Sequence, residues 1–486
     1  MKKKLLLTTL SLSLLLSAGR ADADLPDLGD ISQASMSLAD EVQIGRSAMQ
    51  ALRQQDAISD DLELNDYINA LGGRLAAGAI GSGLHFTFFV VNDSGINAFA
   101  MPGGYIGVNK GLILATQSEG ELASVIGHEM AHVTQHHMAR MQANTLPNQL
   151  TLLATLVAAA LASRAHSSDA VFGTLNAGIG LTLANQLSFS RDFEREADRV
   201  GMQYLSAAGF DVRDMPAFFQ RLQQSEHLNG GDAYAFLRTH PVTVERISEA
   251  QNRAQDAPVR MRVSSTDYLL VREKIRNQIL APAEAVKFYQ TALANRQYLN
   301  EGAQWYGLAL ARLGQHDAAA AGKALARARQ LLPERPMFFS LEASIARSSK
   351  DWNAALAAYR SGLARFPDNR TLGEAQIDLM IQTGQRTAAL QAIRAMQLNT
   401  PTDPVLFRLQ SRLYTESDKL RYHAALGNAL YYEQQYEPAM EQFRLASQAP
   451  GDDFYLRSSI EARTRELEKI LADRKRDGTA QGGGGQ

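Results

Sequence analysis

The second half of the chain repeats itself every 34 residues, and few folds allow such a repeat. In each unit, small residues and larger apolar residues stand at helical spacing, and a proline follows them. The small residues let two helices approach closely and the larger ones fill the space between them, so each unit predicts a pair of helices. A plain helical bundle has no reason to keep this register, whereas a solenoid of stacked pairs does. The matching positions are Ala321, Leu325, Ala328 and Pro333, then Ala355, Tyr359, Gly362 and Pro367, then Ala389, Ile393, Met396 and Pro401, with Trp305 and Phe339 in the preceding helices.

The pattern resembles the tetratricopeptide repeat, and we expect about four units between residues 263 and 473. Arrays of this kind bind segments of partner proteins on a concave surface and carry out no chemistry. Beyond Arg474 the chain ends in a glycine-rich run, so residues 474–486 are expected to be disordered. The less regular units are an early one with Ala285, Tyr289 and Ala292, and a late one, displaced by an insertion, with His423, Leu426, Gly427, Ala439, Phe443 and Ala446.

The first residues have the composition of a secretory signal peptide. Lysines at residues 2–4 precede a leucine-rich stretch, residues 5–16, and Ala21-Asp22-Ala23 supplies a cleavage signature. About a dozen apolar residues are too few to span a bilayer. We therefore expect residues 1–23 to be removed and the mature chain to begin near Asp24.

Charge and cysteine content narrow the function classes. The whole chain has 49 basic and 51 acidic residues, and loss of the signal peptide would leave 45 and 50, a formal net charge of −5. A nucleic-acid partner is therefore not expected, because it would need a basic surface. The chain has no cysteine, which excludes lipidation, disulfides and thiolate ligands, so any metal must be held by His, Asp or Glu. These features fit a protein of the bacterial periplasm.

The part of the mature chain before residue 263 predicts an α+β domain, residues 24–262, that is mostly helical. Residues 62–75 have an amphipathic helical pattern, and residues 85–91 are rich in aromatic and β-branched side chains, as strands are. In residues 97–113, Pro102-Gly103-Gly104 supplies a turn between two short extended segments. Together these segments predict a small antiparallel sheet packed against helices.

Two apolar stretches, residues 150–161 and 171–187, are too short and too interrupted to be clear membrane spans. They fit two buried helices of the same domain. They also fit an apolar flap that touches a membrane or gates the site.

The segment from Gly127 to His132 reads Gly-His-Glu-Met-Ala-His, which is the HExxH arrangement. On a helix, residues four apart lie on one face, so His128 and His132 can both reach one zinc ion. Glu129 lies beside them, where it can take a proton from a water at the metal. The short motif therefore predicts two metal ligands and a catalytic base.

The helix that carries this motif is expected to start near Ser118 or Glu119, because Ser118 and Glu121 have the spacing of a capping box. The alternative is a surface helix with solvated histidines. Its many apolar residues argue against that alternative: Leu122, Val125, Ile126 and Val133.

A catalytic zinc ion has three protein ligands and one open position, and a later segment can supply the third ligand. Residues 191–198 offer several carboxylates on a predicted helix. Glu194 and Asp198 share one face of it, while Glu196 points elsewhere and, with Arg195, is expected to be solvated. We predict Glu194 as the third ligand. Asp198 would accept a hydrogen bond from the outer nitrogen of a ligand histidine.

HExxH followed by Glu194-x-x-Ala197-Asp198 resembles the family of gluzincin peptidases that contains the heat-shock HtpX proteases and the CaaX prenyl endopeptidases. Residues 97–104 (NAFAMPGG) and Thr239-His240-Pro241 with Arg246 agree with it. The resemblance covers nearly the whole mature chain, and the signal peptide and repeats point to exported members of the family. It implies a zincin-like fold and one zinc ion per chain, bound by His128, His132 and Glu194.

The resemblance also implies a substrate and a setting. In this family the substrate lies as an added strand along the edge of the active-site sheet, and residues 97–109 match that stretch, with Asn97, Ala98, Phe99 and Ala100 at the edge. Exported members promote assembly of outer-membrane β-barrel proteins in the periplasm and degrade stalled or misfolded precursors. Their repeats contact the assembly machinery, and peripheral contact with the membrane fits the same setting.

The resemblance places the loop of His240 over the metal. There the imidazole could fill the fourth zinc position and hold the enzyme latent, or it could donate to the oxyanion of the tetrahedral intermediate. Arg246 could bind the substrate backbone or brace a helix. His136 and His137 are interpreted as polar residues at a helix end, since His136 lies two helical turns from His128, too far to share its ion.

We therefore expect metal-assisted peptide hydrolysis in which Glu129 takes the proton and passes it to the leaving amine. A rival hypothesis is a non-proteolytic chaperone or scaffold, in which the repeats hold unfolded clients and the zinc site is quiet. A third, an integral-membrane relative of the prenyl endopeptidases, is disfavoured because no segment has the length of a clear span.

Overall fold

The computed structural model describes residues 37–79, 84–144, 157, 190–229, 235–260, 262–414 and 418–482. The expected signal peptide and nearly all of the two apolar stretches lie outside these residues. Within them, no helix has the length and apolar character needed to cross a membrane.

The described residues contain one three-stranded sheet, with strands β1 (Thr87–Val91), β2 (Ala98–Met101) and β3 (Tyr105–Asn109) in the order β1-β3-β2. β2 and β3 form the expected antiparallel hairpin, and its turn requires left-handed backbone at Gly103 and Gly104, with φ of 76° and 82°. β1, however, pairs with β3 in parallel. The prediction of an antiparallel sheet is therefore wrong: β3 inserts between β1 and β2, and β2 becomes the edge strand.

The two faces of the sheet pack on different helices because side chains alternate along each strand. Phe88 and Val90 of β1 face the core that contains helices α2 and α4, whereas Phe89 and Val91 pack against α1. The predicted amphipathic helix is α2, and it ends at Ala76, one residue beyond the predicted end. The helices of this half are α1 (Leu38–Gln54), α2 (Leu62–Ala76), α3 (Lys110–Ala115), α4 (Glu119–Thr134), α5 (His137–Asn144), α8 (Arg191–Ala207), α9 (Asp214–Asn229), α10 (Ala235–Thr239) and α11 (Val244–Gln255).

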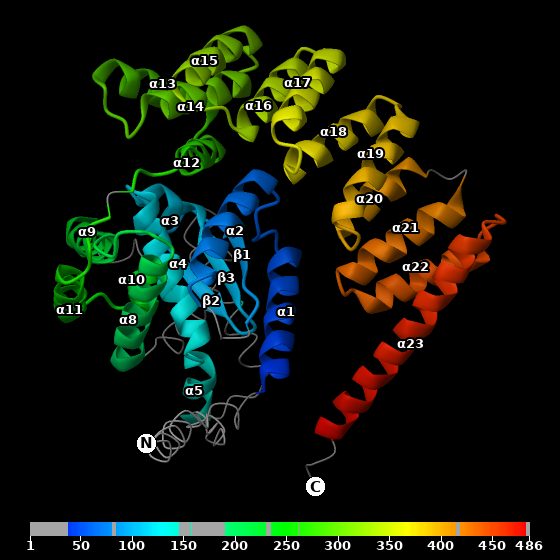
Figure 1. The fold of residues 1–486 in the computed structure, drawn as a ribbon, viewed down its shortest axis with the longest axis horizontal. Coiled ribbons are helices and arrows are strands. Elements are labelled where there is room, and N and C mark those ends of the chain that lie inside the picture. Colours follow the sequence, from blue (N-terminus) through cyan, green and yellow to red (C-terminus); the bar gives the residue numbers. More distant parts are fainter. Residues whose placement is uncertain are drawn as a thin grey trace, which may run out of the picture.

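The rest of the described chain is an arc of antiparallel helices that curves around the first half (Figure 1). Four pairs correspond to the expected repeats, and the equivalent alanines Ala321, Ala355, Ala389 and Ala439 are completely buried between helices. The predicted fold class, an α+β domain followed by an all-α repeat array, is confirmed apart from the strand pairing. The pairs are α14 (Glu301–Gly314) with α15 (Ala318–Leu331), α16 (Pro336–Ser348) with α17 (Trp352–Arg365), α18 (Arg370–Gln382) with α19 (Arg386–Asn399), and α21 (Lys419–Tyr432) with α22 (Tyr436–Gln448).

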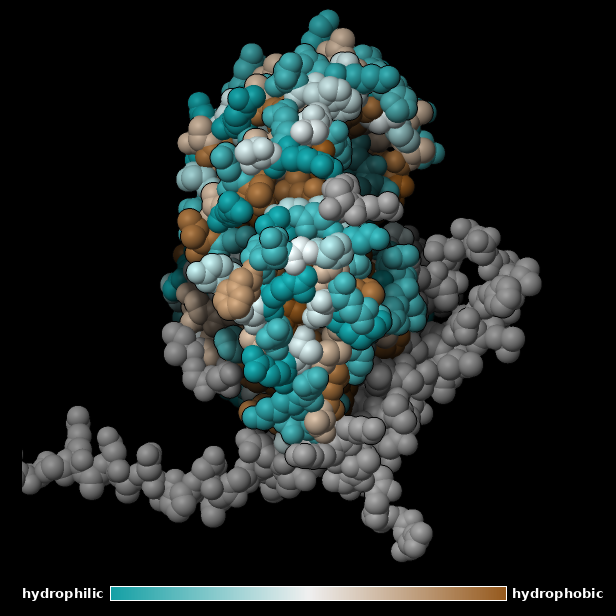
Figure 2. Space-filling model, turned by 90° about the vertical axis from the view of Figure 1, so that its right-hand side faces the viewer, coloured by the Kyte–Doolittle hydropathy of each residue, from teal (hydrophilic) through white to brown (hydrophobic). Residues whose placement is uncertain are grey.

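The remaining helices explain the irregular units. α12 (Thr266–Ile279) and α13 (Pro282–Asn295) form the early pair, and α20 (Pro404–Leu413) fills the insertion. The side of the molecule at the right of Figure 1, where the last repeats lie, is mostly hydrophilic with scattered apolar residues (Figure 2). The final helix, α23 (Phe454–Gly482), continues through residues 474–482 of the tail that was expected to be disordered.

The two halves share one hydrophobic core. The expected boundary at residue 262 falls in the segment between α11 and α12, yet α12 packs on α2 and α3 as well as on α14. Tyr268 of α12 is fully buried, and its hydroxyl lies 2.9 Å from that of Thr116. Buried apolar side chains continue without a break from Leu64 of α2 to Leu341 of α16.

Candidate metal centre

The motif helix α4 begins where its capping residues predict. The hydroxyl of Ser118 accepts a hydrogen bond from the backbone N–H of Glu121 at 3.0 Å. The carboxylate of Glu121 accepts from the N–H of Gln117 at 2.6 Å, so the reciprocal bond of a full capping box is shifted by one residue. Every residue from Glu119 to Val133 is buried, which excludes a surface helix with solvated histidines.

A close helix crossing brings the predicted third ligand to the motif. α8 crosses α4 at two glycines, where a Cβ on Gly201 would lie 3.0 Å from the backbone nitrogen of His128. A Cβ on Gly127 would lie 3.2 Å from the carbonyl oxygen of Gly201. Because neither residue has a side chain, the helices approach closely enough for Glu194, which lies two turns before Gly201 on the same face of α8, to reach both histidines.

Four side chains that can bind a metal converge at this crossing, and all of them are buried: His128, His132, Glu194 and His240. One ligand atom from each lies within 4.8 Å of those of the other three. The Nε2 atoms of the two motif histidines are 3.0 Å apart, and Glu194 oxygens lie 3.5 Å and 3.4 Å from them. His240 presents Nδ1, 2.9 Å from Oε1 of Glu194.

Glu129 lies beside this cluster and is completely buried. Neither of its carboxylate oxygens accepts a hydrogen bond from any described residue. The contact that the structure does show is with Nε2 of His240, 3.5 Å from Oε1. A buried carboxylate without donors is costly unless another group uses it, so its position fits a base that acts on water at the cluster.

The formal charges of the buried groups fit a divalent cation. Glu129, Glu194 and Asp198 bring three carboxylates, and Arg246 is the one guanidinium that contacts this described cluster, so two negative charges remain to be balanced. Burial alone would raise the pKa of Glu194, but His240 and the two motif histidines hold it well below its usual range. Imidazole and carboxylate donors of this kind are the ligands of catalytic zinc.

His128 is held from outside by an aspartate and an arginine. Its Nδ1 lies 3.0 Å from Oδ1 of Asp198, as the helical spacing predicted. Arg246 grips Asp198 with Nε and Nη2, both at 2.7 Å, and its Nη1 reaches Glu194 at 2.7 Å and the carbonyl of Pro241 at 2.8 Å. The side chain is 3% exposed and stacks over Phe219. Its donors are thus engaged inside the protein, which favours bracing over contact with substrate.

His132 is held by a second series of contacts, through His137 and Glu196. The interpretation of His137 as a polar residue at a helix end was therefore wrong, as was the expectation that Glu196 is solvated. His137 is fully buried, with Nδ1 2.9 Å from Nδ1 of His132 and Nε2 3.1 Å from Glu196. Glu196 in turn accepts from Arg140 at 2.9 Å, so it is not simply solvated. Burial lowers the pKa of His137 to about 4, against the opposing effect of Glu196, so the ring is neutral and can accept at one nitrogen while donating at the other.

The position of His137 depends on the backbone conformation of the residue before it. His136 has a φ of 50°, in the left-handed region, and this residue ends α4 and redirects the chain into α5. His137 therefore does not continue the helical face pattern, and residue spacing alone could not place it beside His132.

Comparisons with known proteins agree with this geometry. The profile of "Peptidase family M48" matches residues 63–254. The "Putative beta-barrel assembly-enhancing protease" of Vibrio cholerae is 38% identical over 255 residues, which cover 52% of each chain. The "Beta-barrel assembly-enhancing protease" of Yersinia pestis is 32% identical over 393 residues, which cover 78% of each chain. The chain belongs to peptidase family M48.

Within the family, the chain groups with the relatives named β-barrel assembly-enhancing proteases, although it spans only about half the length of the Vibrio protein. The expected recognition is confirmed, and the chain has the domain of a metallopeptidase family together with a buried His/Glu group that could bind one metal ion. Among solved structures, that of yeast Tom70 covers 74% of this chain and 92% of its own, with a TM-score of 0.30 and 10% identity.

Replacing His137 by phenylalanine should weaken zinc binding by about 10–100-fold, the usual cost of losing an outer hydrogen-bond partner of a metal ligand. The aromatic ring would keep its stack on Phe193 but could neither orient nor polarise His132. The measurement is competition for zinc between the metal-free protein and a chelator. His85→Phe, an exposed site, is the control, and equal zinc affinity in the two variants would contradict the expectation.

Proposed function

We propose that the chain is a periplasmic zinc endopeptidase that acts in quality control of outer-membrane protein assembly and degrades stalled or misfolded β-barrel precursors. The observation that carries this proposal is the buried His-His-Glu cluster next to the edge strand β2 of the described sheet, in a chain whose relatives are named β-barrel assembly-enhancing proteases. Precursors of β-barrels offer unpaired strands, which an edge strand can recognise through backbone hydrogen bonds.

The substrate would add to β2. No described strand pairs with its outer side, and its segment begins at Asn97, whose buried side-chain oxygen has no hydrogen-bond partner among described residues. Phe99 and Ala100 are half-buried, which leaves them available to a fourth strand. Ala100 and the ligand His132 line one pocket, so a peptide along β2 would pass beside the metal ligands.

In the proposed mechanism, His128, His132 and Glu194 hold the zinc ion. When bound, zinc polarises the scissile carbonyl and lowers the pKa of water. Glu129 accepts the proton of the attacking water at one carboxylate oxygen and delivers it to the leaving amine. Asp198 and His137 fix the orientation of the two histidines through their outer nitrogens.

We propose that His240 is a latch on this site. Its Nδ1 lies among the ligand atoms, its ring stacks on Phe236, and its backbone N–H donates to the carbonyl of Phe236 at 2.8 Å. Arg246 ties the adjacent carbonyl of Pro241 to Glu194 and Asp198. As a fourth ligand, His240 would occupy the position that hydrolysis needs, and movement of its loop would free that position.

His240→Ala tests the latch. Hydrolysis of an unfolded β-barrel protein should rise by about tenfold, which corresponds to latch contacts worth about 1.4 kcal/mol. The assay measures initial rates and zinc content of the purified full chain. A fall of about 10²–10³-fold in rate at unchanged zinc content would instead give His240 the oxyanion role.

A second candidate function is a chaperone or scaffold that cuts rarely. The closed arrangement at His240 and the repeat array favour it, since repeats bind partner segments, and the assembly machinery is the partner we propose for them. Complementation separates the candidates: if zinc-loaded Glu129→Gln restores outer-membrane assembly as well as the wild type, the holding function is the principal one.

A further inference from the structure

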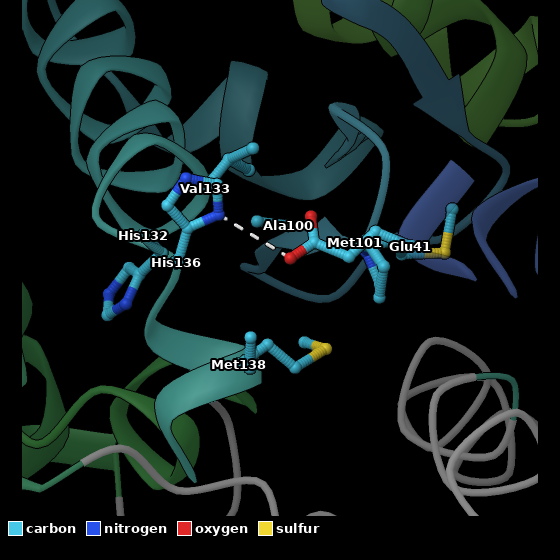
Figure 3. A pocket seen from close by; sticks show the side chains of 9 residues that line it. Glu41, Ala100, Met101, His132, Val133, His136 and Met138 are labelled. Atoms are coloured by element: carbon cyan, nitrogen blue, oxygen red, sulfur yellow. Dashed lines mark ion pairs between the residues drawn. The ribbon is translucent and has the colours of Figure 1, made fainter. Parts of the chain in front are cut away.

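A small pocket lies between the sheet edge and the end of the motif helix (Figure 3). Its walls come from three separate stretches of the chain, and six of its nine lining side chains are apolar. One wall is the ligand His132, so the pocket begins at the metal site itself. The lining residues are Glu41, Ala100, Met101, Pro102, His132, Val133, His136, Met138 and Ala139.

A carboxylate and an imidazole meet at one end of this pocket. Glu41 of α1 is buried, and its Oε1 lies 3.4 Å from Nδ1 of His136, the pair joined in Figure 3. His136 reaches it from left-handed backbone, which side chains other than glycine adopt at a cost and which is concentrated at functional sites. The same turn sends His137 the opposite way, to His132. Glu41 precedes the segment that matches the family profile, so this wall is an addition from outside it.

We propose that this pocket receives the substrate side chain next to the scissile bond and selects a small, uncharged one. The proposal rests on the proposed function, because it takes the substrate to lie along β2. Side chains of an added strand alternate between the two faces of the sheet. A side chain that turns inward beside Ala100 and Met101 would contact His132, which is itself one of the proposed metal ligands.

The size and charge of the pocket set the selection. The cavity measures about 20 Å³ on a scale where one water molecule needs about 10–15 Å³, so it fits a methyl-sized side chain such as that of alanine, and larger groups require the walls to move. Met138 is partly exposed and its flexible thioether borders the pocket, so it is the wall that limits larger groups. The carboxylate of Glu41 repels an acidic side chain, which also loses its hydration on entry.

The test compares selectivity rather than total activity, because partial misfolding lowers the rate for every substrate alike. Two series of quenched peptides carry Ala, Val, Leu or Asp on either side of the scissile bond, and kcat/KM is measured for the zinc-loaded full chain. Met138→Ala should raise the Leu-to-Ala ratio by about tenfold, within the range for one or two methylene groups. Glu41→Gln should raise the Asp-to-Ala ratio by a similar factor. Met440→Ala and Glu461→Gln, in the last helices, are the matched controls and should change neither ratio.

Dissociation constants for the same peptides are measured with zinc-loaded Glu129→Gln, alone and combined with each pocket substitution. Their ratios separate binding from turnover. Unchanged ratios in both pocket variants, in rate and in binding, would overturn the pocket assignment. If the wild type cleaves no peptide but the binding ratios shift as expected, the proposed function fails and the pocket assignment holds.

Discussion

Glu129→Gln is expected to lower peptide hydrolysis by about 10²–10⁴-fold, the contribution of a positioned general base. Glutamine keeps the shape of the side chain but cannot accept the proton of the attacking water. The two buried carboxylate oxygens of Glu129 accept no hydrogen bond from a described residue, so the substitution removes no hydrogen bond within the described protein. Initial rates on an unfolded β-barrel protein give the effect, and metal analysis should show zinc unchanged.

Glu461→Gln provides the control, since this glutamate lies exposed on α23. Its hydrolysis rate should equal that of the wild type. If Glu129→Gln retained that rate as well, another group would have to take the proton, and the mechanism given above would be wrong.

Arg246→Met is expected to lower the free energy of unfolding by about 3–5 kcal/mol, the cost of removing one partner from a buried ion pair. The substitution leaves Asp198 and Glu194 buried without the guanidinium that contacts both. Because Arg246 also holds the carbonyl of Pro241, the loop of His240 should loosen at the same time. Urea denaturation of the metal-free protein measures the change without a contribution from zinc binding.

Arg195→Met is the matched comparison. Arg195 pairs with Glu245 at 2.6 Å on the surface of the same pair of helices, where an ion pair contributes about 0–1 kcal/mol. Equal stability of the two methionine variants would show that Arg246 does not carry the charge balance of the site.

The sequence was sufficient wherever neighbouring residues decide the structure. Helical spacing alone placed His128 beside His132, and Asp198 beside Glu194, and the structure brings all four together. The capping residue Ser118 located the start of α4, and the repeat register located the buried alanines of the solenoid. These signals are local, so one chain without relatives contains them.

Strand order and the outer contacts of the site depend on parts of the chain that are distant in sequence. Residues 85–109 do not show whether β1 pairs with β2 or with β3. Side chains alternate between the two faces of the sheet in the same way in either strand order. His137 reaches His132 only because the backbone at His136 turns into the left-handed region. Glu41 lines the pocket from α1, and the HExxH motif does not predict the position of that helix.

The shared core of the two halves limits how such a protein can be taken apart in evolution. Residues from α2 to α16 form one continuous apolar interior, while the later repeats have small interiors of their own. We therefore expect the first repeats to stay with the metal centre as a single piece. Exchange of the helices beyond α16 would leave this interior intact, and among its costs would be the hydrogen bond that Thr371 of α18 donates to Asp66 of α2 at 2.7 Å.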